Sequence, residues 1–146
     1  MEIDQAKRLL THLFQTQRVA VLATQGERGP YTSLMAVAAT DDLKHILFAT
    51  GRATRKFQNI RRNPRVALLL DNRSPGKSRT NYAVTAVGKT EKIAGEEREA
   101  LQKIFLSKHP DLRPFVAAPD SAFLKCFVEE YVIVANFQDV TVIKPE

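Results

Sequence analysis

Consecutive strand-like segments joined by short polar turns are the feature that most limits how this chain can fold. Residues 19–24 are rich in β-branched and apolar side chains, residues 25–30 are turn formers, and residues 31–40 are strand-like again. A connection this short predicts an antiparallel hairpin, because parallel strands need a crossover of about a dozen residues. A second polar turn at 41–44 leads to a third expected strand at 46–49. These pairs favour an antiparallel barrel with peripheral helices over a doubly wound sheet.

Helical patterns are fewer and lie at intervals between the strands. We expect an amphipathic helix at 4–16 with Asp4 as N-cap, a short helix from about Thr54 to the Asn63–Pro64 pair, and a third helix at 96–109. The third helix should bury Ala100, Leu101, Ile104 and Phe105. Further strands are expected at 66–70, 82–93 with a bulge at Gly88, 122–137 and 140–143, with a loop at 71–81 and a connector at 111–120. The total is about six or seven strands and three helices.

The length and composition are those of an ordinary globular protein. The 146 residues, 44% hydrophobic and 26% charged, predict a single domain spanning 1–146. No apolar run approaches the roughly 18 residues of a membrane span, and the N-terminus lacks the layout of a secretory signal. Cys126 is the single cysteine, so no internal disulfide can form. We therefore expect a cytoplasmic protein without membrane segments.

Positive charge is concentrated in one part of the chain. Residues 52–79 contain nine Lys and Arg and one acid, Asp71, which gives this segment a net charge of +8. The rest of the chain carries −2 of the total of +6. Such a block indicates an anionic ligand or a nucleic-acid surface, with a solvated basic face as the simpler interpretation of its outlying members.

The centre of this block, residues 49–56, has the chemistry of a phosphate site. Thr54 is a good N-cap for a helix whose first N–H groups would be free to meet an anion. Arg55 and Lys56 follow at once, although the positive end of the helix dipole disfavours each cation there by up to about 1 kcal/mol. Thr50 and Arg52 add further donors. A phosphate bound at the helix start would offset the repulsion between these cations and the positive end of the helix dipole. A solvated basic turn is the alternative interpretation.

Motifs along most of the chain resemble those of the pyridoxamine 5′-phosphate oxidase-like flavoprotein family. They are RVAVLAT at 18–24, YTSLM at 31–35, LFAT at 47–50 with TRK at 54–56, NPRV at 63–66, VGKTE at 87–91, and the final strand at 130–140. The resemblance implies an FMN-binding, Greek-key split β-barrel. It also implies a homodimer with the flavin at the subunit interface.

The resemblance also assigns cofactor-binding residues by position. Thr50, Thr54, Arg55 and Lys56 would bind the FMN phosphate, in agreement with the charge argument. A second set would meet the ring: Ser33, Leu34 and Met35 along one strand, and Asn81 from the partner subunit. Backbone groups suit the polar edge of the ring and Leu34 and Met35 its face, with ordinary barrel core as the alternative, favoured for Met35.

One departure from the family concerns the substrate. Members that oxidise pyridoxamine phosphate continue with an Arg- and His-bearing segment that grips the substrate phosphate, and nothing after Phe137 resembles it. We therefore expect an FMN-dependent oxidoreductase with a different small-molecule substrate or electron donor, in which no side chain need act as acid or base. The alternatives are a non-catalytic binder or sensor of flavin, deazaflavin or haem, and a nucleic-acid-binding barrel.

Other chemistry has no support in the sequence. His12, His45 and His109 have no spacing that would place two of them on one metal, so no metal site is expected. His109 is expected to be a favourable charge at the C-terminus of its helix. Cys126 lies in an apolar strand and should be a buried small hydrophobe. No serine stands in a Gly-x-Ser-x-Gly elbow, which argues against a hydrolase.

Overall fold

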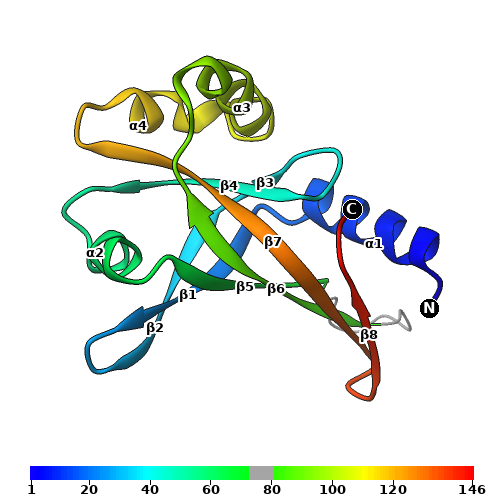
Figure 1. Ribbon diagram of the computed structural model, residues 1–146. Coiled ribbons are helices and arrows are strands. Elements are labelled where there is room, and N and C mark those ends of the chain that lie inside the picture. Colours follow the sequence, from blue (N-terminus) through cyan, green and yellow to red (C-terminus); the bar gives the residue numbers. More distant parts are fainter. Residues whose placement is uncertain (73–80) are drawn as a thin grey trace.

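The computed structural model describes residues 1–72 and 81–146, and within them a curled antiparallel half-barrel with helices around it (Figure 1). The strand order is β2-β1-β5-β6-β7-β4-β3, with β8 paired to β7. The strands are β1 (Val19–Gly26), β2 (Gly29–Ala36), β3 (Ala38–Ala39), β4 (His45–Gly51), β5 (Arg65–Asp71), β6 (Tyr82–Glu91), β7 (Ser121–Ala135) and β8 (Asp139–Ile143). The helices are α1 (Ile3–Thr16), α2 (Arg55–Arg62), α3 (Gly95–Lys108), η1 (Pro110–Leu112, a 3-10 helix) and α4 (Arg113–Ala117).

All strand pairs are antiparallel, so the predicted fold class is confirmed. The hairpin of β1 and β2 is present, and its turn is tighter than expected, with Gly26 paired to Gly29. Gly29 has a φ of 117°, a conformation that glycine adopts at little cost. The bulge at Gly88 is also present, as a register shift between Val87 and Gly88 opposite β7. Most of the predicted 71–81 loop lies outside the described residues.

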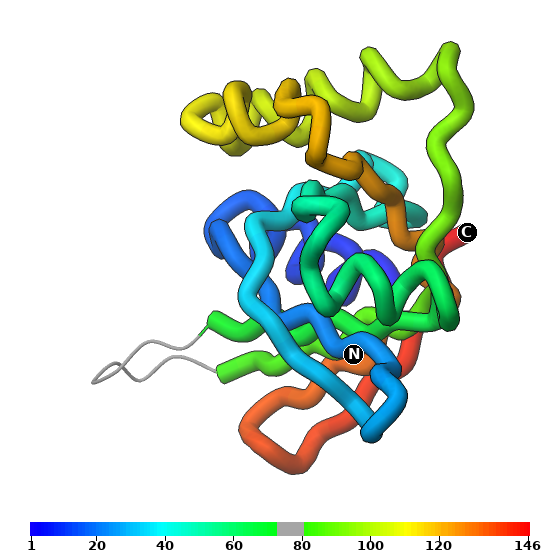
Figure 2. The backbone as a smooth tube through the Cα atoms, turned by 90° about the vertical axis from the view of Figure 1, so that its left-hand side faces the viewer, coloured from blue at the N-terminus to red at the C-terminus, as the bar shows by residue number. Residues whose placement is uncertain are grey.

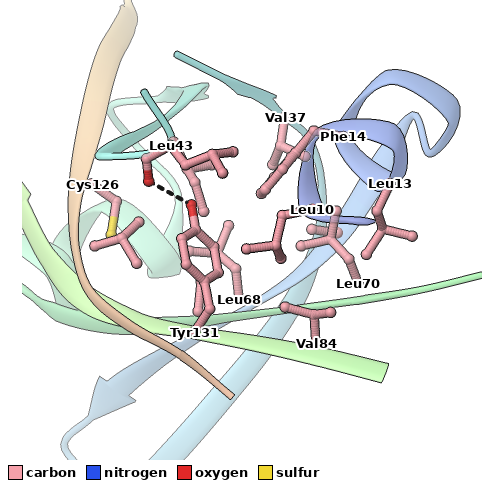
Figure 3. Packing of buried hydrophobic residues seen from close by; sticks show 14 of the residues in the cluster. Leu10, Leu13, Phe14, Val37, Leu43, Leu68, Leu70, Val84, Cys126 and Tyr131 are labelled. Atoms are coloured by element: carbon pink, nitrogen blue, oxygen red, sulfur yellow. Dashed lines mark hydrogen bonds between the residues drawn. The ribbon is translucent and has the colours of Figure 1, made fainter. Parts of the chain in front are cut away.

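The main core fills the curl of the sheet and is closed by α1. Its buried side chains come from the inner faces of the long strands and from the apolar stripe of α1. Figure 3 shows Leu10 and Phe14 of this helix pointing toward Tyr131 and the strand residues around it. Tyr131 is fully buried, and its ring meets Phe14 edge to face at 6.3 Å between centroids. The N-terminal helix is therefore part of the barrel core.

A second, smaller core lies on the opposite face of β4. The helices α3 and α4 lie together on one side of β4 (Figures 1 and 2). The cluster beneath them contains Leu47 and Ala49, whereas Ile46 and Phe48 of the same strand point into the main core. Because both faces of β4 are covered, its sequence is apolar without alternation. Packing on its two faces therefore fixes β4 between the barrel core and the layer formed by α3, η1 and α4, called here the helical layer.

Several local expectations were wrong. Eight strands and four α-helices, with one 3-10 helix, are present among the described residues, where six or seven strands and three helices were expected. Glu2 occupies the N-cap of α1, without a side-chain cap bond, and Asp4 lies inside the helix. The expected connector at 111–120 is largely helical, because it contributes apolar side chains to the second core. The stripe expected on α3 is buried at Phe105, while Ile104 is 38% exposed. None of the described helices is long and apolar enough to cross a bilayer.

His109 is not the exposed C-terminal charge that we expected. Its side chain is fully buried, and Nε2 donates to the carbonyl oxygen of Val37 at 2.8 Å. Nδ1 is buried and has no hydrogen-bond partner among the described residues. Burial, and then the nearby charges of Lys108 and Arg18, lower the pKa of His109. The imidazole is therefore held neutral, since a proton on Nδ1 would have no acceptor.

We expect this histidine to weaken the fold in mild acid. An unfolded histidine titrates near pH 6.5, so below that pH the unfolded state binds a proton that folded His109 resists. The contribution of neutral His109 to the free energy of unfolding should be fully present well above pH 6.5 and should be lost as the pH falls below that value. Urea unfolding of the wild type at pH 5.5 and 7.5 measures this loss. His109→Gln should reduce the difference between the unfolding free energies at the two pH values, whereas His12→Gln, on the exposed face of α1, should leave that difference unchanged. An equal difference in the wild type and both variants would contradict the role given to His109.

Candidate functional site

The turn between β4 and α2 is built around two threonine hydroxyls. Thr54 is the N-cap of α2, as predicted, and its Oγ1 accepts the N–H of Phe57 at 3.3 Å and donates to the carbonyl of Gly51 at 2.8 Å. Thr50 Oγ1 lies 3.0 Å from Thr54 Oγ1. Thr50 is 1% exposed, so its hydroxyl is held by the strand rather than by solvent. The pair forms a fixed polar corner at the end of β4.

The start of α2 is electropositive, and no described carboxylate forms an ion pair with Arg55 or Lys56. The first N–H groups of a helix lack intrahelical acceptors, and Thr54 satisfies those of Phe57 and Gln58. The N–H groups of Arg55 and Lys56 remain at the helix start, together with their cationic side chains. No acid occupies the first turn of α2. The local field therefore favours an anion at this point, as the sequence suggested.

An open groove of about 420 Å³ begins at this corner. Thr50, Gly51, Thr54 and Lys56 line its polar end. Its remaining walls are apolar and come from β2, β4 and the helical layer: Leu34, Met35, Ala36, Ala49, Phe105, Leu112 and Phe115. Leu34 is 70% exposed and Phe115 is 43% exposed, so two large apolar side chains stand open to solvent here. An anion-binding corner beside an apolar wall suits a ligand with a phosphate at one end and a flat apolar body at the other.

A family model described as pyridoxamine 5′-phosphate oxidase matches residues 6–131. The chain belongs to the pyridoxamine 5′-phosphate oxidase family. The match takes in β1 to β6, the α2 start and most of β7. The predicted family membership is therefore confirmed. A search of curated protein sequences gave no match.

Solved structures place the chain within the same fold. A haem-binding protein from Mycobacterium smegmatis superposes with a TM-score of 0.86 at 16% identity, over 99% of this chain and 60% of that one. An FAD-binding protein from Mesorhizobium loti gives 0.70 at 21% identity, over 92% and 95%. A general stress protein 26-related protein of the pyridoxinephosphate oxidase family from Clostridium acetobutylicum gives 0.75 at 18% identity, over 98% and 96%. These likenesses support the fold.

Five of the eight site residues predicted from the family resemblance line the groove. These are Leu34, Met35, Thr50, Thr54 and Lys56. Met35 is 6% exposed and belongs also to the main core, which was the alternative interpretation of this residue. Leu34, its neighbour on β2, points to the other face and stands free, because side chains alternate along a strand. Leu34 is thus the residue of β2 best placed to meet a ligand.

The other three predicted residues lie outside this groove. Ser33 faces inward from β2, and its Oγ is buried without a partner among the described residues. Arg55 turns to the other side of the helix start, where its guanidinium lies 5.0 Å from the centre of the Tyr31 ring. Asn81 immediately precedes β6, at the end of the strand away from the groove, and is exposed. Its predicted contact belongs to a partner subunit, so one chain does not test it.

The wall that the helical layer supplies was not predicted from the sequence. Phe105 of α3, Leu112 of η1 and Phe115 of α4 complete the groove. The prolines in and before the 111–120 segment favoured a connector there. The spacing of Leu112 and Val116, four residues apart as on one side of a helix, was the available signal.

Proposed function

We propose that this chain binds FMN in the groove between β2, β4 and the helical layer, and that it is an FMN-dependent oxidoreductase. The observation that carries the proposal is the polar corner of Thr50, Thr54 and Lys56 at the end of an apolar groove of about 420 Å³. A cation and the free N–H groups of a helix start are donors that a phosphate needs when it leaves water, and the two hydroxyls fix the turn that presents them. The family supplies the precedent for a flavin-type ligand.

Each part of the groove has a distinct task in this proposal. The start of α2, fixed by the Thr50–Thr54 pair, holds the phosphate, and Lys56 balances its charge from a half-buried position. Leu34 and Phe115 cover the apolar faces of the ring and exclude water from it. When bound, FMN supplies the hydride chemistry, and the protein supplies position and electrostatics. The substrate need only reach the open side of the groove.

Haem binding is the second candidate, because one similar structure is named as a haem-binding protein. The groove residues favour flavin over haem. No histidine, cysteine or tyrosine is among the described residues that line the groove, whereas these side chains are the common axial ligands of haem iron. The helix start, which the hydroxyl pair fixes in place, can bind the phosphate of FMN, and haem carries no phosphate. FMN is accordingly the ligand that we propose. A non-catalytic protein that binds flavin or deazaflavin in the same groove is the alternative form of this proposal.

The proposal includes three further expectations. The working form is a homodimer that completes the flavin site with a contact from the partner subunit, for which Asn81 is the candidate. The electron donor or substrate is a small molecule. The protein works in the cytoplasm, where the fully buried thiol of Cys126, whose pKa burial raises to about 12, stays reduced and inert.

FMN titration followed by flavin fluorescence tests the proposal. We expect the wild type to bind FMN more tightly than riboflavin, because riboflavin lacks the phosphate. Lys56→Met removes a charged donor of about 1.5–3 kcal/mol and Thr54→Val removes the N-cap that fixes the helix start, so the double variant should weaken FMN binding by about tenfold or more. The same double variant should leave riboflavin binding nearly unchanged.

Arg8→Met is the matched control, since Arg8 is an exposed cation on α1 away from the groove. A wild-type protein that takes up no FMN would overturn the flavin proposal. Equal affinities for FMN and riboflavin would show that the polar corner at the start of α2 does not bind the phosphate. Turnover of NADH or NADPH with an added acceptor then separates an enzyme from a binder.

A further inference from the structure

A second and larger cleft, of about 840 Å³, opens on the other side of α2. It is bounded by α2, by the segment from the end of β6 to the start of α3, and by the first residues of β7. Its lining includes Phe57, Ile60 and Arg61, which lie three and four residues apart and therefore share one helix face. Lys56 lines the FMN groove instead. The two sites use opposite sides of the same helix.

The rim of this cleft is strongly cationic. Arg52, Arg61, Lys92 and Arg98 line it, and all four side chains are exposed. Among the described residues, none of the four forms an ion pair, although other exposed arginines such as Arg65 do. The described part of the lining contains one carboxylate, Glu91, which lies 3.5 Å from Nε2 of His45. Four unpaired cations around one cavity favour a ligand that carries more than one negative charge.

The floor of the cleft is apolar and well ordered by packing. Ile60 is 6% exposed, and Phe123 of β7 is 4% exposed and packs edge to face against Phe105 at 5.6 Å between centroids. The Phe57 ring is half-buried on the same side, with the Arg52 guanidinium 5.8 Å from its centre. An apolar surface this close to a rim of guanidinium and ammonium groups suits a flat aromatic group attached to an anion.

We propose that this cleft binds a nucleotide, with the base against the apolar floor and a diphosphate or longer phosphate chain on the cationic rim. The volume lies within the range of about 300–1,000 Å³ that small-molecule pockets occupy. A single-stranded nucleic acid would need successive aromatic platforms along an open groove, and Phe57 is the one aromatic side chain of the described lining that is not buried. The proposal does not depend on FMN, because the cleft shares no lining residue with the FMN groove.

Isothermal titration with ADP, at about 0.15 M salt, tests this site. We expect ADP to bind with a micromolar Kd and more tightly than either adenosine or pyrophosphate, since each fragment reaches half of the cleft. Arg61→Ala with Arg98→Ala removes two rim cations and should weaken ADP binding at least tenfold. Lys103→Ala, an exposed cation of α3 outside the lining, is the matched control and should leave the Kd unchanged.

Three results would overturn the proposal. The first is no heat of binding with ADP at millimolar concentration. The second is an equal loss of affinity in Lys103→Ala, which would indicate diffuse attraction to a basic surface. The third is loss of ADP binding in Thr54→Val with Lys56→Met but not in the double arginine variant, which would place ADP in the FMN groove. Failure of FMN binding in the separate titration would leave the cleft proposal standing.

Discussion

Gly88→Ala should destabilise the protein by at least about 3 kcal/mol. A Cβ at this position would overlap the carbonyl oxygen of Phe127, and it would lie 2.9 Å from the Phe127 carbonyl carbon and 3.0 Å from Cys126 Sγ. The overlapping atoms belong to the backbone of β7, so no rotation of a side chain can make room. Gly88 lies at the bulge where β6 and β7 change register, and the two longest strands would have to separate there.

Gly95→Ala is the control for this change. Gly95 begins α3, and an added Cβ would meet nothing within 4 Å. Alanine is the better helix former, so the free energy of unfolding should be unchanged or rise by up to about 1 kcal/mol. Urea unfolding of the two variants without added flavin measures the contrast. A loss below about 1 kcal/mol in Gly88→Ala would show that the close approach of β7 to Gly88 can relax.

Tyr131→Ala should lower the free energy of unfolding by about 4 kcal/mol. Tyr131 is among the largest fully buried side chains and stands in the centre of the main core (Figure 3). Its hydroxyl donates to the carbonyl oxygen of Leu43 at 2.7 Å. Leu43 has a φ of 63°, which is unfavourable for leucine, so this bond also holds a strained turn in place.

Tyr131→Phe separates the hydrogen bond from the packing. The ring remains, but the Leu43 carbonyl loses its donor, and we expect a loss of about 1–2 kcal/mol. Tyr31→Phe is the control, because the Tyr31 side chain is partly exposed and lies against Arg55. It should change stability by less than about 0.5 kcal/mol. If Tyr131→Phe is as stable as the wild type by urea unfolding, the bond to Leu43 contributes nothing net.

The antiparallel architecture was predictable because its signals are local. Short turns allow only antiparallel neighbours, and the β1–β2 hairpin formed as expected. Gly88 was recognisable as a bulge because a glycine inside a strand pattern usually marks one. Where the expectation failed, a distant contact had overridden a local preference. The 111–120 segment is largely helical because Leu112 and Val116 pack against β4 and α3, and because Pro110 and Pro114 occupy permitted positions at helix starts.

The environment of His109 shows the same limit for electrostatics. From the sequence it stood at a helix end, where a positive charge is favourable. The fold instead buries it beside Val37, about 70 residues earlier in the chain, so neutrality is the stable state. Whether a titratable group is charged depends on how much water reaches it, and burial is a property of the whole fold.

The sequence by itself determined which hydroxyl and cationic side chains stand at the β4–α2 turn. The N-cap, the helix start and its cations lie within seven residues. Thr50, Thr54 and Lys56 are therefore close together regardless of how the rest of the chain packs. Only the tertiary structure decided what stands beside that turn. Leu34, Phe105 and Phe115 come from three elements far apart in the chain, and packing against β4 brings them to one groove. Local hydrogen bonds act over a few residues, whereas the shape of a site follows from non-directional burial of apolar surface across the whole molecule.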